Sequence, residues 1–242
     1  MFASTLPLPP ENVLDLWFFH STLGWAAWRP KRQIALSIAE RLRADRFRVR
    51  NLSAQWIAHR TMVRSLLARY QGVGPEALMF NTNCALCGDP LHGKPRLEGA
   101  TNLSFSAAHC GGALAVAVSA SGEVGIDIES VRRDFPGFAS DICTPEELQL
   151  VFSPSETSSP LRVWVLKEAV AKAAGLGLAL PMSEIRLVRS GGDVIQGVVG
   201  SQHYWLSNHE LGQDVVGAVA TSFHPRIIKQ FGVDPSHVRV LG

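Results

Sequence analysis

A chain of 242 residues with 46% hydrophobic and 18% charged side chains has room for a substantial core, built as one large domain or two small ones. Its formal net charge of +2 implies no strong attraction to nucleic acid or membranes, and its longest apolar run, residues 113–118, is far too short to cross a bilayer. Four cysteines do not make a disulfide scaffold and no secretory signal opens the chain, so we expect a cytoplasmic protein.

The first third of the chain is basic and helical in pattern. Residues 41–50 hold five arginines and one aspartate, which suits a local anion site. Residues 30–70 lack proline after the first position and are rich in Ala, Leu and Arg. This predicts one or two helices that end near Gly72 and Gly74.

The rest of the chain alternates between turn signals, short apolar runs and one long helical pattern. Residues 81–101 predict a long loop, and Thr144-Pro-Glu-Glu147 predicts a capped helix start. Residues 161–174 predict a helix, because they contain no Gly or Pro. Strands are predicted at residues 103–106, 113–119, 124–129, 185–188, 194–198, 204–207 and 215–221.

An internal repeat is visible at an offset of 103 residues. The matched pairs are Arg64 with Lys167, Arg69 with Lys172, Gly72-x-Gly74 with Gly175-x-Gly177, and Ala115-Val-Ala117 with Ala218-Val-Ala220. Ala, Val and Gly are common, but a constant offset over three segments argues against a chance match. We therefore expect an α+β fold of two similar α/β lobes, residues 1–120 and 121–242, related by a pseudo-twofold repeat with the active site at their interface.

Two carboxylates share one face of the predicted strand at residues 124–129. Residues two apart on a strand point the same way, so Val124, Ile126 and Ile128 face a core while Asp127 and Glu129 face the other side. Such a pair can hold a hard cation such as Mg²⁺. The simpler interpretation is a solvated strand face, but the third acid downstream favours a metal site.

The predicted helix at residues 161–174 carries that third acid. Glu168 and Lys172 lie four residues apart, roughly opposite an apolar stripe. A surface Glu–Lys pair of small energetic value is the simpler interpretation. Trp164 and the Gly175-x-Gly177 ending make the segment more specific, and a carboxylate and an amine beside a metal could serve proton transfer and charge neutralisation.

Two loop features admit more than one interpretation. His109 and Lys94 would matter for chemistry only if a phosphate binds near them. Cys84-x-x-Cys87, with His92 and a distant Cys110, invites a zinc site, but a single Cys-x-x-Cys is weak evidence and we favour free thiols.

Five strings in order resemble the Sfp-type, two-lobed branch of the phosphopantetheinyl transferase superfamily. They are His92-Gly-Lys-Pro95, Phe105-Ser-Ala-Ala-His109, Val124-Gly-Ile-Asp-Ile-Glu129, Thr144-Pro-Glu-Glu147 and Trp164-x-x-Lys-Glu168-x-x-x-Lys172-x-x-Gly-x-Gly177. The resemblance implies transfer of the 4′-phosphopantetheine arm of coenzyme A to a serine of an apo acyl, peptidyl or aryl carrier protein, with release of adenosine 3′,5′-bisphosphate. It also implies the two-lobed pseudo-twofold fold, in agreement with the repeat.

The resemblance also assigns roles to individual residues. Asp127, Glu129 and Glu168 would ligate Mg²⁺ together with the coenzyme A pyrophosphate, and Lys172 would bind the phosphates and assist the leaving group. Lys94 and His109 would contact the 3′-phosphate region with an arginine such as Arg43, and Arg46 and Arg50 are further candidates. Glu147 matches another acid of the motif without a defined role.

Two departures from the family pattern stand beside these assignments. Ala108 and Ser106 replace a serine and an asparagine, and Gln55 stands where a basic residue is common. The general base stays open between Glu168, Glu129 and a metal-bound water. Another magnesium-dependent phosphoryl or nucleotidyl transferase, or a carrier-binding module without activity, would share part of these features. An internal pseudo-dimer has less need of a partner chain, so we expect a monomer.

Overall fold

The computed structural model describes residues 5–20, 35–84, 86–89, 93–99, 102–132, 139–151, 159–191, 194–212 and 214–233. The helices are α1 (Ile38–Asp45), α2 (Arg50–Gln71), α3 (Ala139–Ile142), α4 (Pro145–Leu150) and α5 (Ser159–Ala174), with 3₁₀ turns at Pro75–Ala77, Gly177–Ala179 and Met182–Glu184. The strands are β1 (Val13–His20), β2 (Phe80–Asn81), β3 (Arg96–Leu97), β4 (Ser104–Cys110), β5 (Ala113–Ser119), β6 (Val124–Ser130), β7 (Arg186–Arg189), β8 (Ile195–Val199), β9 (Gln202–Glu210), β10 (Val215–Thr221) and β11 (Ile227–Val233). The predicted α+β class is confirmed.

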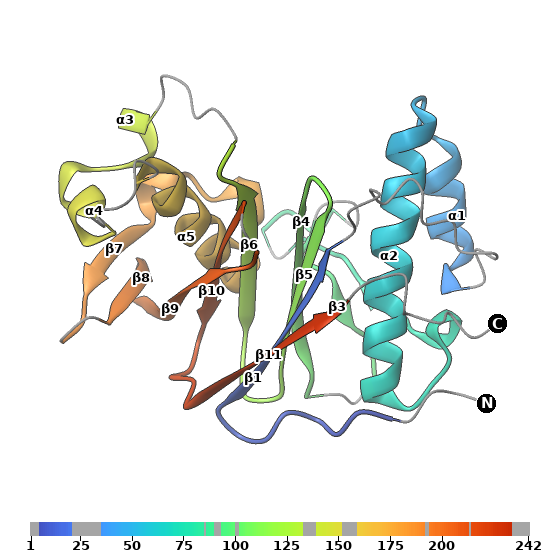
Figure 1. The fold of residues 1–242 in the computed structure, drawn as a ribbon. Helices are drawn as coiled ribbons and strands as arrows, with labels where there is room; N and C mark the ends of the chain where they lie inside the picture. Colours follow the sequence, from blue (N-terminus) through green and yellow to red (C-terminus); the bar gives the residue numbers. More distant parts are fainter. Residues whose placement is uncertain are drawn as a thin grey trace.

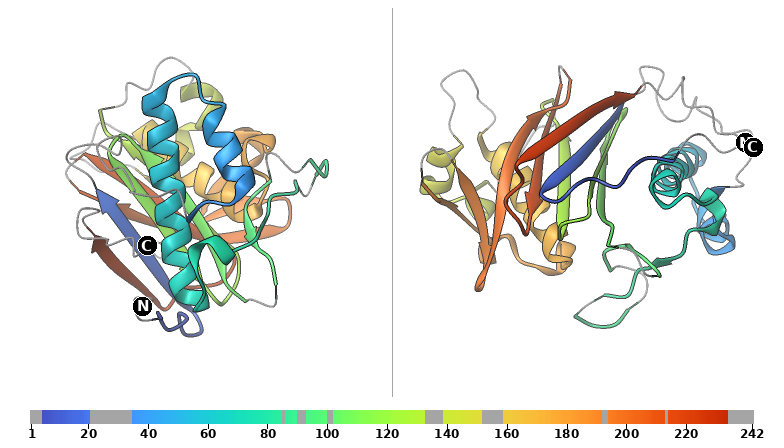
Figure 2. Two further views of the ribbon diagram at one scale, coloured as in Figure 1. Left: turned by 90° about the vertical axis from the view of Figure 1, so that its right-hand side faces the viewer. Right: turned by 90° about the horizontal axis from the view of Figure 1, so that it is seen from below.

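Two larger sheets organise the molecule (Figure 1). The first has the strand order β11-β1-β5-β4, and the second has the order β6-β10-β9-β8-β7. Every neighbouring pair is antiparallel except β1 and β11, which run parallel. Helices α1 and α2 lie at one end of the molecule and α3 and α4 at the other (Figures 1 and 2).

Three apolar clusters hold these elements together. Helix α2 packs on one face of the first sheet, and α5 packs on one face of the second. The remaining faces, with Leu14 and Leu16 of β1 and Ile126 and Ile128 of β6, bury each other between the sheets. At the junction the Ile126 amide donates to Ser106 Oγ at 3.1 Å, so β4 and β6 lie side by side.

The helix boundaries follow local chemistry. The predicted end of the first long helix is confirmed, because Gly72 closes α2 in the left-handed region at φ 67°. The predicted start of the short helix is also confirmed, since the Thr144 hydroxyl accepts from the Glu147 amide and the Glu147 carboxylate accepts from the Thr144 amide. The predicted loop at residues 81–101 contains the short β2–β3 ribbon in its described part.

Two strands of the first sheet are additions to the sequence prediction. Strand β1 was not predicted because it is buried on both faces and shows no alternation. Strand β11 lies in the tail, for which no strand was predicted. Strand β11 pairs with β1, so the second predicted lobe supplies an edge strand to the first sheet. The division into residues 1–120 and 121–242 stays a prediction.

Candidate functional site

The junction of β4, β6 and α5 collects most of the predicted site residues. Strand β6 carries Asp127 and Glu129 on the face toward α5, because Ile126 and Ile128 fill the core between the sheets. Gly125 lets the helix approach closely on that face. A Cβ at Gly125 would lie 2.0 Å from the Ala169 carbonyl oxygen. The predicted alternation of this strand is thus confirmed.

Glu168 is buried in α5, not part of a surface pair. Only 6% of Glu168 is exposed to solvent, and its Oε1 has no hydrogen-bond partner among the described residues. Burial raises the pKa of this carboxyl, and Asp127 and Glu129 raise it further while Lys172 opposes them. Asp127 and Glu129 therefore lie close enough to Glu168 to repel its charge.

Lys172 neutralises part of this negative charge. Its Nζ donates to Oδ1 of Asp127 at 2.6 Å, so its partner lies on β6 and not one turn away at Glu168. Among the described residues no group of three or more His, Cys, Asp or Glu side chains already surrounds a single metal position. The carboxylates would have to close around a cation by side-chain rotation.

His109 reaches the same junction from β4. Partial burial lowers the pKa of its imidazole, the charge of Lys172 lowers it further, and Asp127 opposes both. The His59 ring of α2 lies against it with 4.4 Å between ring centroids. One turn earlier on α2, Gln55 Nε2 donates to the Gly111 carbonyl at 3.1 Å, which ties α2 to the β4–β5 turn.

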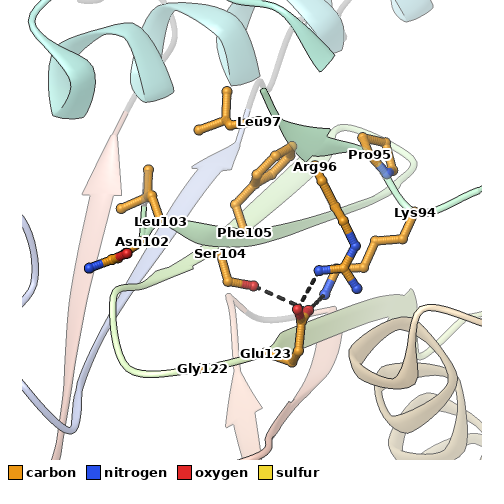
Figure 3. A pocket seen from close by; sticks show the side chains of 10 residues that line it. All are labelled: Lys94, Pro95, Arg96, Leu97, Asn102, Leu103, Ser104, Phe105, Gly122 and Glu123. Atoms are coloured by element: carbon orange, nitrogen blue, oxygen red, sulfur yellow. Dashed lines mark hydrogen bonds and ion pairs between the residues drawn. The ribbon is translucent and has the colours of Figure 1, made fainter. Parts of the chain in front are cut away.

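Lys94 lies in a neighbouring pocket of about 240 Å³ (Figure 3). Its Nζ donates to Glu123 Oε2 at 2.7 Å and to the Val124 carbonyl at 2.8 Å. Arg96 binds the other oxygen of Glu123 and approaches Gly175, the residue that ends α5. Lys94 and Gly175, the start of the predicted Gly-x-Gly ending, thus come together.

Arg43 has a different environment. It is exposed on α1, with its guanidinium 5.7 Å from the centroid of the Trp56 ring. The contacts described for it join it to this ring and not to Lys94 or His109, so its assignment to coenzyme A stays a prediction. His92 lies outside the described residues.

Glu147 belongs to the framework of the second half. Besides capping α4, it forms an ion pair with Lys167 at 2.8 Å and accepts a hydrogen bond from the Leu187 amide. Ser106, one of the two departures at the histidine motif, binds the β6 backbone.

Cys84 and Cys87 form no disulfide, and the Cys87 and Leu86 amides donate to the Cys84 sulfur and lower the pKa of its thiol. Whether this pair holds metal stays a prediction.

Sequence reasoning missed three residues near the site. Arg96 follows Lys94 by two positions and so shares its side of an extended segment, and Glu123 directly precedes the acidic strand. His59 follows Gln55 by four positions and shares its helix face. The sequence shows each of these spacings, but it does not show which residues from other segments contact these side chains.

Known proteins share part of this sequence. A sequence model described as the 4′-phosphopantetheinyl transferase superfamily matches residues 123–220, a range that includes Asp127, Glu129, Glu168 and Lys172. The 4′-phosphopantetheinyl transferase HetI of Nostoc sp. is 33% identical over 189 residues, which are 72% of this chain and 76% of that protein. The chain belongs to the 4′-phosphopantetheinyl transferase superfamily.

A second relative supports the same family assignment. The 4′-phosphopantetheinyl transferase of Bacillus subtilis is 28% identical over 178 residues, 69% of this chain and 75% of that protein. The family and the enzyme class predicted from the sequence are confirmed. No described helix is both long and apolar enough to span a membrane.

Proposed function

We propose that the chain transfers the 4′-phosphopantetheine arm of coenzyme A to a serine hydroxyl of an apo carrier protein and releases adenosine 3′,5′-bisphosphate. Family membership supports the reaction class. The observation that carries the proposal is the buried Glu168 carboxyl, whose pKa is raised by burial and by the facing acids Asp127 and Glu129. A cluster of this kind suits a site for a cation and phosphates and is costly as a purely structural feature.

The donor set fits Mg²⁺. Asp127, Glu129 and Glu168 supply only carboxylate oxygens, which this ion prefers, and Oε1 of Glu168 lacks a hydrogen-bond partner among the described residues. These three residues would hold the ion. When bound, Mg²⁺ would supply charge neutralisation between the site and the pyrophosphate and would polarise the phosphoryl group under attack.

The chain's own residues would then position the reactants. Lys172 would neutralise charge on the departing bisphosphate, and its place beside Asp127 puts its ammonium group at the acid cluster. His109 would donate a hydrogen bond from its ring to a phosphate oxygen. Glu168 and Glu129 are the carboxylates available to take the serine proton, with a water as the alternative.

The two-lobed arrangement is part of the same proposal. In each half a strand (β1 or β6) leads to a long helix (α2 or α5) and then to a hairpin (β4–β5 or β9–β10), and the first strand pairs with the second hairpin strand. This common connectivity supports a pseudo-twofold relation between the halves. In β5 and β10 the burial pattern supports an offset of 102 residues instead of the 103 read from the sequence. Val116 and Ala218 both face the helices, whereas Ala115 faces the other sheet.

The partners follow from the reaction. We propose an apo carrier protein and coenzyme A as substrates, and a cytoplasmic monomer that binds neither nucleic acid nor membranes. The test is to incubate the protein with coenzyme A, Mg²⁺ and a panel of apo carriers. A carrier mass increase equal to phosphopantetheine, abolished by EDTA, is expected. Complex formation without a mass change would contradict the transferase proposal and support a binding module.

A further inference from the structure

The carboxylate of Glu123 occupies the centre of a basic pocket (Figure 3). Lys94 Nζ lies 2.7 Å from Oε2, Arg96 binds Oε1, and Ser104 Oγ lies 3.4 Å from Oε2. Lys94 and Arg96 lie on one extended segment at β3 and Ser104 lies on β4, whereas Glu123 directly precedes β6. The backbone of Glu123 is fixed, because its amide donates to Ser222 Oγ and its carbonyl accepts from the Ser222 amide, each at 3.0 Å.

The charges of this pocket are unequal. Two cations face one carboxylate, and the Lys94 side chain is only 9% exposed. Burial lowers the pKa of Lys94 and Glu123 opposes this, so the ammonium group depends on a nearby anion. Burial raises the pKa of Glu123, but Arg96 and Lys94 outweigh it and hold that pKa below its ordinary value. Glu123 is therefore an anion that satisfies a cationic site from within the chain.

The site itself has the features of a phosphate pocket. Arginine and lysine from neighbouring positions can grip a phosphate through several oxygens, whereas Glu123 offers two oxygens and a single charge. The Glu123 side chain is 35% exposed and the Arg96 side chain 51%, so both can move into solvent. Apolar side chains of Pro95, Leu97 and Phe105 and the amide of Asn102 line the same pocket and could hold a heterocycle beside the phosphate.

We propose that Glu123 is a displaceable internal counterion that competes with a phosphate monoester of the ligand for Lys94 and Arg96. The inference rests on the proposed function, under which that monoester is the 3′-phosphate shared by coenzyme A and adenosine 3′,5′-bisphosphate. Glu123 lowers the affinity for both molecules, because their phosphate must displace it. It thereby also favours release of the bisphosphate after transfer.

The test is calorimetric binding to the full chain with three probes: adenosine 3′,5′-bisphosphate, adenosine 5′-monophosphate and inorganic phosphate. Glu123→Gln keeps an acceptor for Lys94 but removes the competing charge. It is expected to tighten binding of the bisphosphate by about tenfold and of the 5′-monophosphate by less than about twofold. An equal gain for inorganic phosphate and the bisphosphate would overturn the assignment to the ligand's 3′-phosphate.

Two further variants define the mechanism. Arg96→Ala added to Glu123→Gln should remove most of the gain, while Glu98→Gln, an equal charge change at an exposed residue that does not line the pocket, should leave the affinity unchanged. Glu123→Asp, with a shorter side chain, should give a smaller gain and serves if the glutamine variant does not fold. Unchanged or weaker bisphosphate binding by folded Glu123→Gln overturns the proposal.

The proposed function is tested separately, by measuring the mass increase of the carrier with the wild-type chain. Transfer by the wild type together with an unchanged Glu123→Gln affinity would reject the counterion role alone. Absence of transfer with every carrier would reject the function, whatever the calorimetry shows.

Discussion

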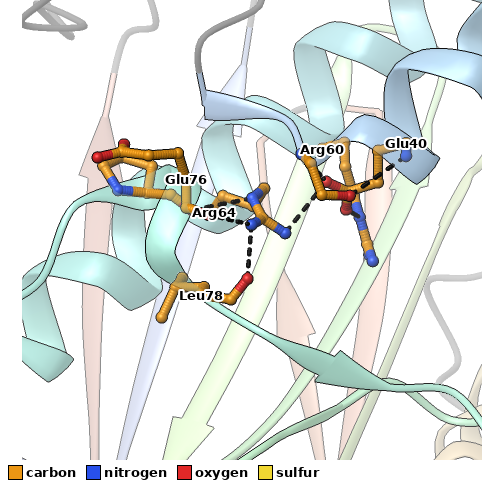
Figure 4. A network of polar contacts seen from close by, with 7 residues as sticks. Glu40, Arg60, Arg64, Glu76 and Leu78 are labelled. Carbon is orange, nitrogen blue, oxygen red and sulfur yellow. Dashed lines mark hydrogen bonds and ion pairs between the residues drawn. The ribbon is translucent and has the colours of Figure 1, made fainter.

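Each half of the molecule contains a buried ion pair of the same kind, but the strands around the two pairs differ. In the first half, Glu40 completes the capping box of α1 and forms an ion pair with Arg64 of α2, with 3.0 Å between Oε2 and Nη1 (Figure 4). In the second, Glu147 closes the capping box of α4 and receives Lys167 of α5 at 2.8 Å. Arg64 also donates to the Pro75 and Leu78 carbonyls, and Lys167 to those of Ile142 and Met182.

The strands beneath the long helices show the difference. Trp17 of β1 lies opposite Val116 and packs toward α2, whereas the equivalent position in β6 is Asp127, opposite Ala218 and facing α5. The first half fills this place with an aromatic core, and the second fills it with carboxylates. A feature present in both halves is best explained by folding, and one present in a single half by function. Glu147 is therefore a framework residue, and Asp127 and Glu168 are functional candidates.

The largest effect should come from the acids found only in the second half. Asp127→Ala and Glu168→Gln should each lower the transfer rate by about a thousandfold, because the site loses a cation ligand. Carrier mass spectrometry measures the rate, and thermal unfolding checks the fold. Glu146→Gln, an exposed acid of α4, is the matched control and should keep wild-type turnover. Normal turnover in either site variant would contradict the metal assignment.

The shared pair predicts equal losses of stability in both halves. Removing one partner of a buried ion pair leaves an uncompensated charge, so Glu40→Gln and Glu147→Gln should each lower the free energy of unfolding by about 3 kcal/mol. Burial raises the pKa of Glu40, but Arg60, the Ser37 amide and Arg64 outweigh it and keep the carboxylate charged.

Urea unfolding measures the loss of stability, with Glu146→Gln expected within about 0.5 kcal/mol of wild type. A large loss in only one half would break the comparison.

How much of this comparison the sequence predicts depends on the range of each contact. Alternation along residues 124–129 correctly assigned Asp127 to one face, and the capping box at Thr144 is a local pattern. The partner of Lys172 was not predictable, because Asp127 lies 45 positions earlier and meets it only when β6 packs on α5. A helical repeat suggests Glu168 as its neighbour, and tertiary packing overrides that pattern.

The proposed repeat combines local and long-range contacts in the same way. Arg64 and Lys167 were matched by spacing within a helix, which is local, and each binds a glutamate that belongs to a capping box. Spacing could not reveal that both are buried, since Glu40 and Glu147 lie on other helices. Strand β1 shows the limit most clearly. Burial on both faces removes the alternation that marks a strand, and its neighbours β5 and β11 are distant in the chain.

A smaller effect is expected at the close approach of β6 to α5. Gly125→Ala would place a methyl group 2.0 Å from the Ala169 carbonyl oxygen, so the helix must shift away from Asp127. We expect a stability loss of about 2 kcal/mol and a lower transfer rate, measured by urea unfolding and carrier mass. Gly232→Ala in β11, where a Cβ meets no atom of the described residues within 4 Å, is the control. Equal behaviour of the two variants would contradict the close packing.

The smallest effect concerns one buried histidine in each half. Burial lowers the pKa of His59 to about 3, helped by His109, and that of His209 to about 4, against an ordinary 6.5. Their unfolded forms therefore bind more protons between pH 6.5 and 4, so stability should fall as the pH falls through this window and stay level above it. The slope should be on the order of 1 kcal/mol per pH unit and per histidine.

The region between pH 6.5 and 4.5 separates these histidines from the carboxylates whose pKa values are lowered. Glu40 and Glu123 have lowered pKa values and lose their contribution only at more acid pH. His209 bridges Ser207 on β9 and Gln230 on β11, so His209→Gln retains polar contacts while removing the proton site. Urea unfolding at pH 7, 6 and 5 should show a shallower decline for this variant. A slope identical to wild type would mean that His209 titrates equally in the folded and unfolded chains.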